Sequence, residues 1–431
     1  MPSAAPIPRG PSALPLGSAA GLLMQPGCPV CQYAAEAGDR YLAWFALEGH
    51  ADPVTITRLC ASLGMCARHT RRLIGQPGAA ARLTAVYRYL LQAALEPLAG
   101  RGRWRPAGCP ACQHDEAADG RALGTLLDGL PETGVRERYL ELGGMCWPHV
   151  QAAAGVRGHR RAAAWAAGAA AASAAGQRAG LGLLAGGPDY DAGERARLRA
   201  ALPAGGRPPP GACLACFTSA RAEAAALAGL VQAVALGPLA GDTGAAVPRH
   251  EGGLCAGHLH DAALLPGGHG AAVLGWQAGG QAAVLARLAS SPARRQGGVA
   301  GWLRGRPAPA RGDECPVCRA RERAARQALR HWAAGHAAAA AHRDATPPAR
   351  GDGQLLCVRH LLAMRAADPA AGQLAAGHAA RHAAVLIEEL AEAFRKGTWA
   401  FRHESRGAEM TAWRRAAAFL DGAVFGGGPP G

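Results

Sequence analysis

Apolar residues recur along this chain with the spacing of α-helices. In the segment 79–98, for example, Leu83, Val86 and Leu90 fall on one face of a helix and form an apolar stripe. The same reasoning predicts helices over 32–48, 53–63, 79–98, 113–127, 132–142, 162–184, 372–395 and 408–420. No βαβ pattern accompanies them. The chain is therefore predicted to be all-α.

The composition supports this prediction and restrains the interpretation of the charge. Hydrophobic residues make up 49% of the chain but aromatic residues only 5%, so alanine, leucine and valine dominate, which favours helices with thin cores. A net charge of +15 would ordinarily suggest nucleic acid, a membrane surface or another acidic partner. However, Lys396 is the only lysine, and the excess of Ala, Gly, Arg and Pro is typical of GC-rich bacterial coding. The charge therefore mainly predicts a solvated basic surface.

Two short motifs, Cys-x-x-Cys and Cys-x-x-His, alternate four times and account for all but one of the 13 cysteines. The Cys-x-x-Cys pairs are Cys28 and Cys31, Cys109 and Cys112, Cys213 and Cys216, and Cys315 and Cys318. The Cys-x-x-His pairs are Cys66 and His69, Cys146 and His149, Cys255 and His258, and Cys357 and His360. Four ordered copies disfavour the alternative that these are inert core cysteines.

The spacing of the motifs favours pairing each Cys-x-x-Cys with the Cys-x-x-His that follows it. The first and third cysteines of the four modules lie 38, 37, 42 and 42 residues apart. Pairing each Cys-x-x-His with the next Cys-x-x-Cys instead would give erratic spacing and leave both ends of the array incomplete. We therefore expect Cys28 and Cys31 to share a site with Cys66 and His69, and the later modules to follow the same rule.

Three thiolates and one imidazole are a standard ligand set for structural zinc. Each module supplies four ligands, so we expect four closed Zn²⁺ sites. Iron–sulfur ligation is the less favoured alternative, since such clusters usually have cysteine ligands only. Disulfide redox chemistry of the thioredoxin kind is disfavoured by the absence of a βαβ pattern.

Proline- and glycine-rich stretches suggest where the modules end. The predicted division is a disordered segment at 1–27, module 1 at 28–104, module 2 at 105–186, a linker at 187–211, module 3 at 212–303, module 4 with C-terminal helices at 304–422 and a disordered tail at 423–431. We expect the four modules to form a repeat array arranged in two pairs.

Other features add little chemistry. Cys60 lies outside the repeat and is interpreted as a small core residue. His378 and His382 are four residues apart but have no evident third ligand, which disfavours a zinc protease motif. The first 27 residues do not form a signal peptide pattern, and the apolar run 162–176 is too short to span a membrane. We therefore expect a cytoplasmic protein with no membrane span.

The motifs resemble those of an uncharacterised bacterial family, a domain of unknown function with repeated Cys-Pro-x-Cys and Gly-x-Cys-x-x-His motifs. The matching segments include 64–69, 144–149 and 253–258, and the closing segment 394–402 also looks like that family's. Leu355 and Leu214 depart from the pattern without removing a ligand. The resemblance implies metal binding but names no reaction.

These observations favour a zinc-stabilised binding or adaptor scaffold whose partner is another protein. No catalytic constellation is found in the sequence. The first alternative is a nucleic-acid or polyanion binder that uses arginines beside the sites. Those arginines are Arg68, Arg71, Arg72, Arg319 and Arg321. The second alternative is an iron–sulfur or thiol redox protein.

Overall fold

The protein is all-α over the residues that the structure describes. The computed structural model describes residues 18–76, 79–101, 108–176, 212–236, 254–263, 273, 276, 315–341, 356–401 and 403–422. Within these ranges the regular elements are helices and no strand is present, which confirms the predicted fold class.

The helices fall into an N-terminal and a C-terminal half. The first half contains α1 (Ala19–Leu22), α2 (Pro29–Leu47), η1 (Gly49–Ala51), α3 (Pro53–Ala61), α4 (Ala67–Ile74), α5 (Ala79–Leu98), α6 (Pro110–Gly129), α7 (Thr133–Glu141), α8 (Trp147–Ala154) and α9 (Arg160–Gly176). The second contains α12 (Leu214–Leu236), α13 (Ala256–Ala263), α15 (Pro316–Ala341), α16 (Val358–Ala367), α17 (Pro369–Lys396), η4 (Trp399–Phe401), η5 (Ala408–Thr411) and α18 (Ala412–Asp421).

Most of the predicted helices are present, with shifted starts. Helix α5 has the predicted bounds, whereas α2 and α6 each begin three residues earlier than predicted. Both begin with a proline directly after a cysteine at the N-cap, and a proline in the first turn has no hydrogen bond to lose. Helix α12 is not among the predicted helices. Its sequence contains many alanines and few polar residues, so it shows no distinct polar stripe.

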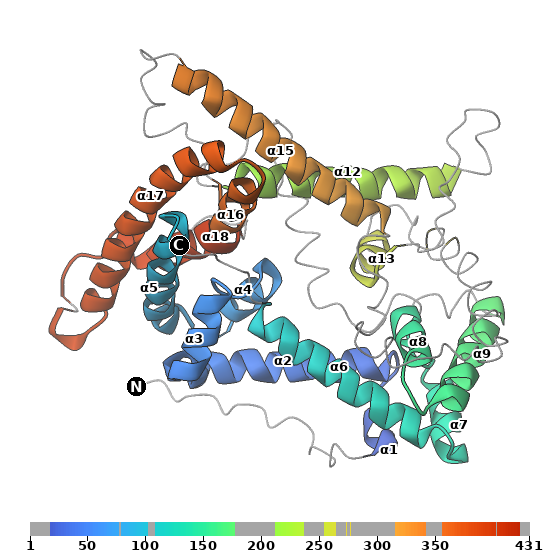
Figure 1. Cartoon of the computed structure of the whole chain (residues 1–431). Coiled ribbons are helices and arrows are strands. Elements are labelled where there is room, and N and C mark those ends of the chain that lie inside the picture. The colour runs from blue at the N-terminus through green and yellow to red at the C-terminus, as the bar shows by residue number, and fades with distance from the viewer. Residues whose placement is uncertain are drawn as a thin grey trace.

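Each half contains one long antiparallel helix pair. In the first half α2 lies along α6, and in the second half α12 lies along α15 (Figure 1). Because the helices of each pair run in opposite directions, their N-termini lie at opposite ends of the pair. This arrangement decides which motifs can meet.

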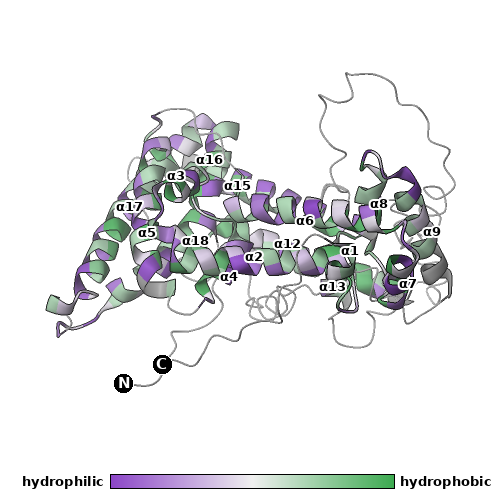
Figure 2. Cartoon of the chain, turned by 90° about the horizontal axis from the view of Figure 1, so that it is seen from below, coloured by the Kyte–Doolittle hydropathy of each residue, from purple (hydrophilic) through white to green (hydrophobic). Residues whose placement is uncertain are grey.

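The two halves share one hydrophobic core. Helix α5 of the first half packs against α17 and α18 of the second, so Leu90 and Leu91 are buried in the same cluster as Leu386 and Leu390. Figure 2 shows α17 with hydrophilic and hydrophobic residues interleaved, as expected for a helix that buries only one face. The two halves are therefore packed together rather than joined only through a linker.

Polar contacts reinforce the junction between the halves. Arg365 on α16 donates from Nη1 to the carbonyl of Pro97 at 2.7 Å. Arg359, at the start of α16, donates from Nη2 to the carbonyls of Ser62 and Met65 at 3.4 and 3.1 Å. These carbonyls precede α4, so the junction lies directly beside a ligand-bearing segment.

Several sequence expectations concern segments at the ends and between the halves. The predicted linker 187–211 and tail 423–431 lie outside the described residues. Residues 18–27, placed in the disordered segment, instead include α1, whose Ala19 packs against Gly129 of α6. One helix, over Leu214–Val234, is long and apolar enough to cross a membrane by length and composition only. That test is also met by core helices, so the absence of a span stays a prediction.

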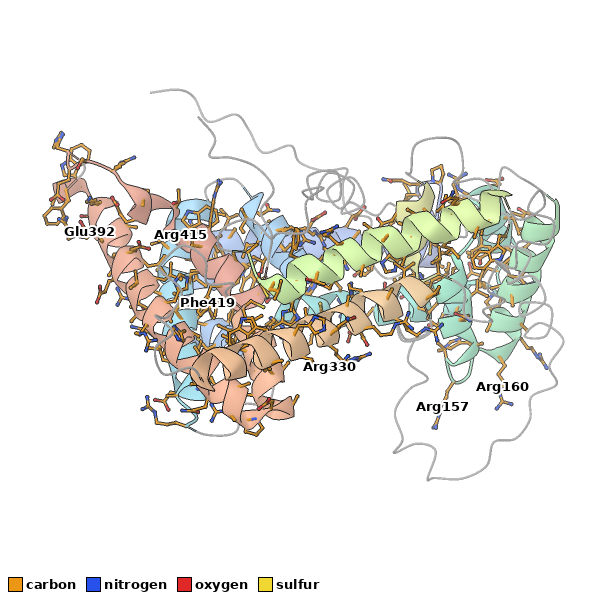
Figure 3. All side chains as sticks on the ribbon, turned by 90° about the horizontal axis from the view of Figure 1, so that it is seen from above. Arg157, Arg160, Arg330, Glu392, Arg415 and Phe419 are labelled. Atoms are coloured by element: carbon orange, nitrogen blue, oxygen red, sulfur yellow. The ribbon has the colours of Figure 1, made fainter. Side chains whose placement is uncertain are left out.

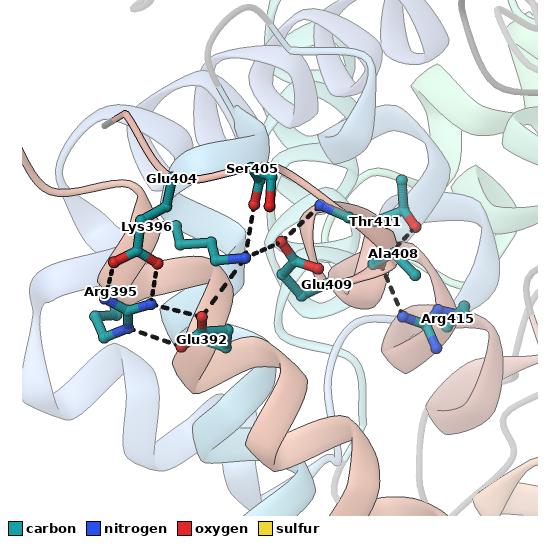
Figure 4. Close-up of polar contacts among 10 residues, drawn as sticks. Glu392, Arg395, Lys396, Glu404, Ser405, Ala408, Glu409, Thr411 and Arg415 are labelled. Carbon is teal, nitrogen blue, oxygen red and sulfur yellow. Dashed lines mark hydrogen bonds and ion pairs between the residues drawn. The ribbon is translucent and has the colours of Figure 1, made fainter. Parts of the chain in front are cut away.

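The segment after α17 is held by a network of ion pairs (Figure 4). Arg395 contacts both Glu392 and Glu404. Lys396 lies 3.0 Å from Glu409, which also accepts a 2.7 Å hydrogen bond from the Gly407 amide. This amide and the Lys396 ammonium lower the pKa of Glu409 to about 2.

Acid should therefore loosen this segment. Because the pKa of Glu409 is lowered from its ordinary value of 4.5 in the folded protein, its stabilising contacts are present above that value and are lost as the pH falls toward about 2. We expect amide hydrogen exchange in residues 403–411, corrected for intrinsic rates, to be faster at about pH 3 than at about pH 6. A Glu409→Gln variant should exchange fast at both values. Equal protection of the wild type at both would contradict the prediction.

Candidate metal centres

The sixteen predicted ligands gather into four Cys3His groups. In each group the four ligand atoms lie within 4.8 Å of one another. We name them site I (Cys28, Cys31, Cys146 and His149), site II (Cys66, His69, Cys109 and Cys112), site III (Cys213, Cys216, Cys357 and His360) and site IV (Cys255, His258, Cys315 and Cys318). The prediction of four Cys3His groups is confirmed, whereas metal binding at these residues stays a prediction.

The pairing predicted from sequence spacing is wrong. Cys28 and Cys31 meet Cys146 and His149 of the next module, not Cys66 and His69. Cys66 and His69 in turn meet the second Cys-x-x-Cys, and sites III and IV repeat the exchange in the other half. Each group therefore spans two of the predicted modules.

Helix length explains the exchange. Helix α2 has 19 residues and spans about 28 Å, whereas α3 has only 9 and spans about 13 Å, too short to carry the chain back to the start of α2. The chain therefore reaches Cys66 near the far end of α2, where the N-terminus of antiparallel α6 presents Cys109. Helices α6 and α7, with 20 and 9 residues, carry the chain to Cys146 beside the start of α2 in the same way. The predicted helix lengths already contained this signal.

All eight half-sites use the same position at a helix N-terminus. The first cysteine directly precedes a helix, and the second ligand is the third residue of that helix. Thus Cys28 caps α2 and Cys31 occupies its first turn, while Cys146 and His149 do the same for α8. Two helix N-termini face each group, and their positive dipole ends stabilise thiolates.

A buried apolar residue fixes each half-site to the core. This residue lies between the two cysteines of each Cys-x-x-Cys motif, or directly before the cysteine of each Cys-x-x-His motif. Its side chain is almost inaccessible to solvent in all eight copies. These residues are Val30, Ala111, Ala215 and Val317 in the Cys-x-x-Cys motifs, and Met65, Met145, Leu254 and Leu356 before the Cys-x-x-His motifs. Packing of these side chains therefore helps to orient the ligand residues.

The distances between ligand atoms fit one tetrahedral ion. A metal–sulfur bond of about 2.3 Å places two thiolates of a tetrahedron about 3.8 Å apart. The sulfur atoms of Cys31 and Cys146 are 3.6 Å apart, and those of Cys255 and Cys318 are 3.8 Å apart. In every group the histidine turns Nδ1 toward the sulfurs, at 3.0 to 3.6 Å. The residues present therefore fit a metal ion at each site.

Carboxylates orient three of the four histidines. The Nε2 atom of His69 lies 2.9 Å from Asp115, and that of His149 lies 3.3 Å from Asp119. Both carboxylates are on α6, so this helix supports the histidines of sites I and II together. In site IV the Nε2 atom of His258 lies 2.8 Å from Glu223 on α12. A carboxylate behind a ligand histidine fixes its tautomer and orientation, as is typical of metal sites.

A glycine makes room for one of these carboxylates. A Cβ atom at Gly38 on α2 would lie 2.6 Å from Oδ1 of Asp115. Any larger residue would push Asp115 away from His69. Gly38 therefore serves the support of site II although it contains no donor atom itself.

Site III is built differently. His360 has no carboxylate partner among the described residues, although Cys213 and Cys216 at the start of α12 meet the start of α16 as the half-sites do in the other groups. The C-terminal helix α18 ends at Gly422, whose left-handed φ of 75° and missing side chain allow it to lie against this site. A Cβ there would be 2.2 Å from the sulfur of Cys216. The C-terminal helix thus covers site III.

Without metal, the groups hold protons that a metal ion would displace. Hydrogen bonds from neighbouring thiols lower the pKa of Cys109, Cys213 and Cys315, while the same contacts raise the pKa of Cys112. Burial lowers the pKa of His69, but its hydrogen bonds to Asp115 and the thiols outweigh burial and raise it to about 11. Metal binding at these sites is therefore coupled to proton release.

Other predicted features do not assemble into a further site. His378 hydrogen-bonds to Arg381, whereas the His382 ring lies edge-on against Phe419, so the two histidines have separate contacts. Cys60 packs against the main core, as expected of a small core residue.

The arginines considered for polyanion binding are partly engaged within the protein. Arg72 pairs with Asp39 at 2.5 Å, and Arg321 lies 3.8 Å from Glu223. Elsewhere, Arg157, Arg160 and Arg330 point away from the helical body (Figure 3). Basic side chains are therefore found both beside the sites and elsewhere on the surface.

Double substitutions should distinguish the two pairings. Cys66→Ser with Cys109→Ser removes ligands from site II alone, so the double variant should lose no more metal than either single variant. Cys28→Ser with Cys66→Ser damages sites I and II and should lose twice as much, because the two cysteines serve different ions. Metal analysis of the purified variants measures this. The opposite pattern would support pairing within the sequence modules.

Removing a supporting carboxylate should weaken one site selectively. Asp119→Ala leaves all ligands in place but frees Nε2 of His149, so we expect about a 10- to 100-fold loss of metal affinity at site I. Competition with a chelator measures this. Asp128→Ala is the matched control, since Asp128 is on the same helix and pairs with His159, which is not a ligand. Equal effects of both substitutions would refute the role of Asp119.

Comparisons with known proteins give no relative for this chain. No family model matches it, and neither the curated proteins nor the solved structures include a match. Membership of the uncharacterised bacterial family therefore stays a prediction made from the repeated motifs. The ligand sets and their surroundings carry the functional conclusion.

Proposed function

We propose that this protein is a zinc-stabilised helical scaffold that binds other molecules through its surface. The observation that carries the proposal is the presence of four Cys3His groups, each with four protein donors within 4.8 Å of one another. Each ion joins the starts of two helices that are far apart in the sequence. Removal of the ions would therefore release helices that hold the surfaces in place.

Zinc is the ion that this ligand chemistry favours. Zn²⁺ is borderline-soft, takes four ligands in a tetrahedron and is commonly bound by three cysteines and one histidine. An iron–sulfur cluster has several iron atoms bound by different ligands, so its four protein donors spread over a wider space than a group whose donor atoms all lie within 4.8 Å of one another. The short spacing therefore supports a single ion at each site.

A structural role is favoured over catalysis at the metal. A catalytic zinc usually keeps one coordination position for water or substrate, whereas these groups offer four protein ligands. His69 is fully buried and held by Asp115, which supports a closed and rigid site. In small zinc modules such sites supply about 10–16 kcal/mol of folding free energy at neutral pH. We propose the same contribution here, in a reducing cytoplasm that keeps the cysteines free for metal.

Metal analysis of protein purified anaerobically from its own host tests the proposal. We expect four zinc ions per chain, a colourless protein and a loss of helix content when a strong chelator removes the metal. A Cys60→Ser variant is the matched control, because Cys60 lies outside all four groups and should leave the zinc content unchanged. Iron with visible absorption, or full helix content after complete metal removal, would contradict the proposal.

A further inference from the structure

Three large aromatic side chains are exposed together at the end of α17. We call Phe394, Trp399 and Phe401 the aromatic tip. Their exposed fractions are 53%, 79% and 39%. By contrast, Phe45 and Phe217 are buried, while Trp44 and Tyr89 are exposed elsewhere, on α2 and α5. Because only 5% of the chain is aromatic, this concentration within eight residues is a distinct apolar feature of the surface.

The aromatic tip is held in place rather than loosely attached. The Arg395 guanidinium stacks over the Phe401 ring at 4.3 Å and pairs with Glu392 and Glu404. Lys396 donates to the carbonyl of Ser405 at 2.7 Å and so closes the segment that follows the tip (Figure 4). These contacts hold the backbone that carries the exposed rings. Less conformational entropy is therefore lost when the rings become buried against a partner.

Three carboxylates of this region are paired with basic side chains. Glu392 and Glu404 pair with Arg395, and Glu409 pairs with Lys396. Arg406 is exposed beyond them. The ion-paired groups at the base of the tip are thus close to neutral, whereas Glu388, one turn before Glu392 on α17, is exposed. Attraction to an anionic surface therefore comes from the charge of the whole protein rather than from the base of the tip.

The shape of the region restricts the occupant. The tip lies at one extremity of the molecule, where the chain turns beyond the end of α17, and Glu392 marks this end in Figure 3 (Figures 1 and 3). A convex group of exposed rings needs either a matching pocket or a fluid surface that adapts to it. Tryptophan and phenylalanine partition into the interface of a lipid bilayer.

We propose that the aromatic tip inserts into the interface of an anionic lipid bilayer. The net charge of +15 draws the whole protein toward anionic lipids over a long range, and burial of the rings then retains it. The inference rests on the proposed role as a binding scaffold and names its partner as a membrane surface. The proposal requires only that the tip enter the interface, and it requires no helix to cross the membrane.

Flotation of the full-length, metal-loaded protein with lipid vesicles tests the proposal. We expect binding to phosphatidylcholine vesicles that contain about 30% phosphatidylserine, and weaker binding to phosphatidylcholine alone. Trp399→Ala should weaken binding about tenfold, because the most exposed ring no longer leaves water. Leu140→Ala is the control, since Leu140 is also exposed but lies on α7, far from the tip in sequence.

A second variant reports insertion directly. Trp399→Phe keeps an aromatic ring and should bind vesicles nearly as well as the wild type. With bromine-labelled lipids, the fluorescence quenching seen in the wild type should be mostly absent in this variant, because it lacks the tryptophan of the tip.

Two outcomes would overturn the proposal. One is the absence of vesicle binding by the wild type, and the other is equal binding by Trp399→Ala and the wild type. Either result would favour a pocket on a partner protein as the binding site for the tip. Zinc content and helix content of the same samples are measured in parallel, so a failure of the scaffold proposal can be distinguished from a failure at the tip.

Discussion

The four metal groups impose one constraint on this protein: two helix starts must meet at each of them. A first cysteine at the N-cap and a second ligand in the first turn recur in every half-site. Because α2 and α6 are antiparallel, their starts lie at opposite ends of the pair, and each must find a Cys-x-x-His motif there. The short helices α3 and α7 deliver those motifs to the correct ends. Crossed ligation thus follows from helix length and direction.

The support around the ligands makes neighbouring sites interdependent. Asp115 and Asp119 are one turn apart on α6, yet they hold histidines of two different sites. A shift of this helix would therefore disturb both ions. Arg359 extends the connection between the halves, because it follows Cys357 of site III and binds the carbonyl of Met65, which precedes Cys66 of site II. The sites are better described as one connected framework than as four separate modules.

The C-terminal helices connect this framework to the aromatic tip. The buried side of α17 joins α5 and α18 in the shared core, while its far end presents the aromatic tip. Site III lies under the end of α18 at Gly422, so the metal framework and the base of the tip are connected through the C-terminal helices. In the proposed function, the metal ions would hold the helices together, and partners would bind at surfaces away from the metal sites.

The sequence by itself determined the helical class, the bounds of α5 and the sixteen residues of the four Cys3His groups, because periodicity and short motifs are local properties. It did not reveal which motifs pair, since equal spacing along the chain says nothing about the direction in which a long helix carries it. Nor did it mark Asp115, Asp119 or Gly38, which have no motif of their own and gain their roles only where α2 meets α6. The residues of each half-site can thus be identified from a short stretch of sequence. Ligand partnership was decided by the tertiary structure, because the packing of antiparallel helices sets which ends come together.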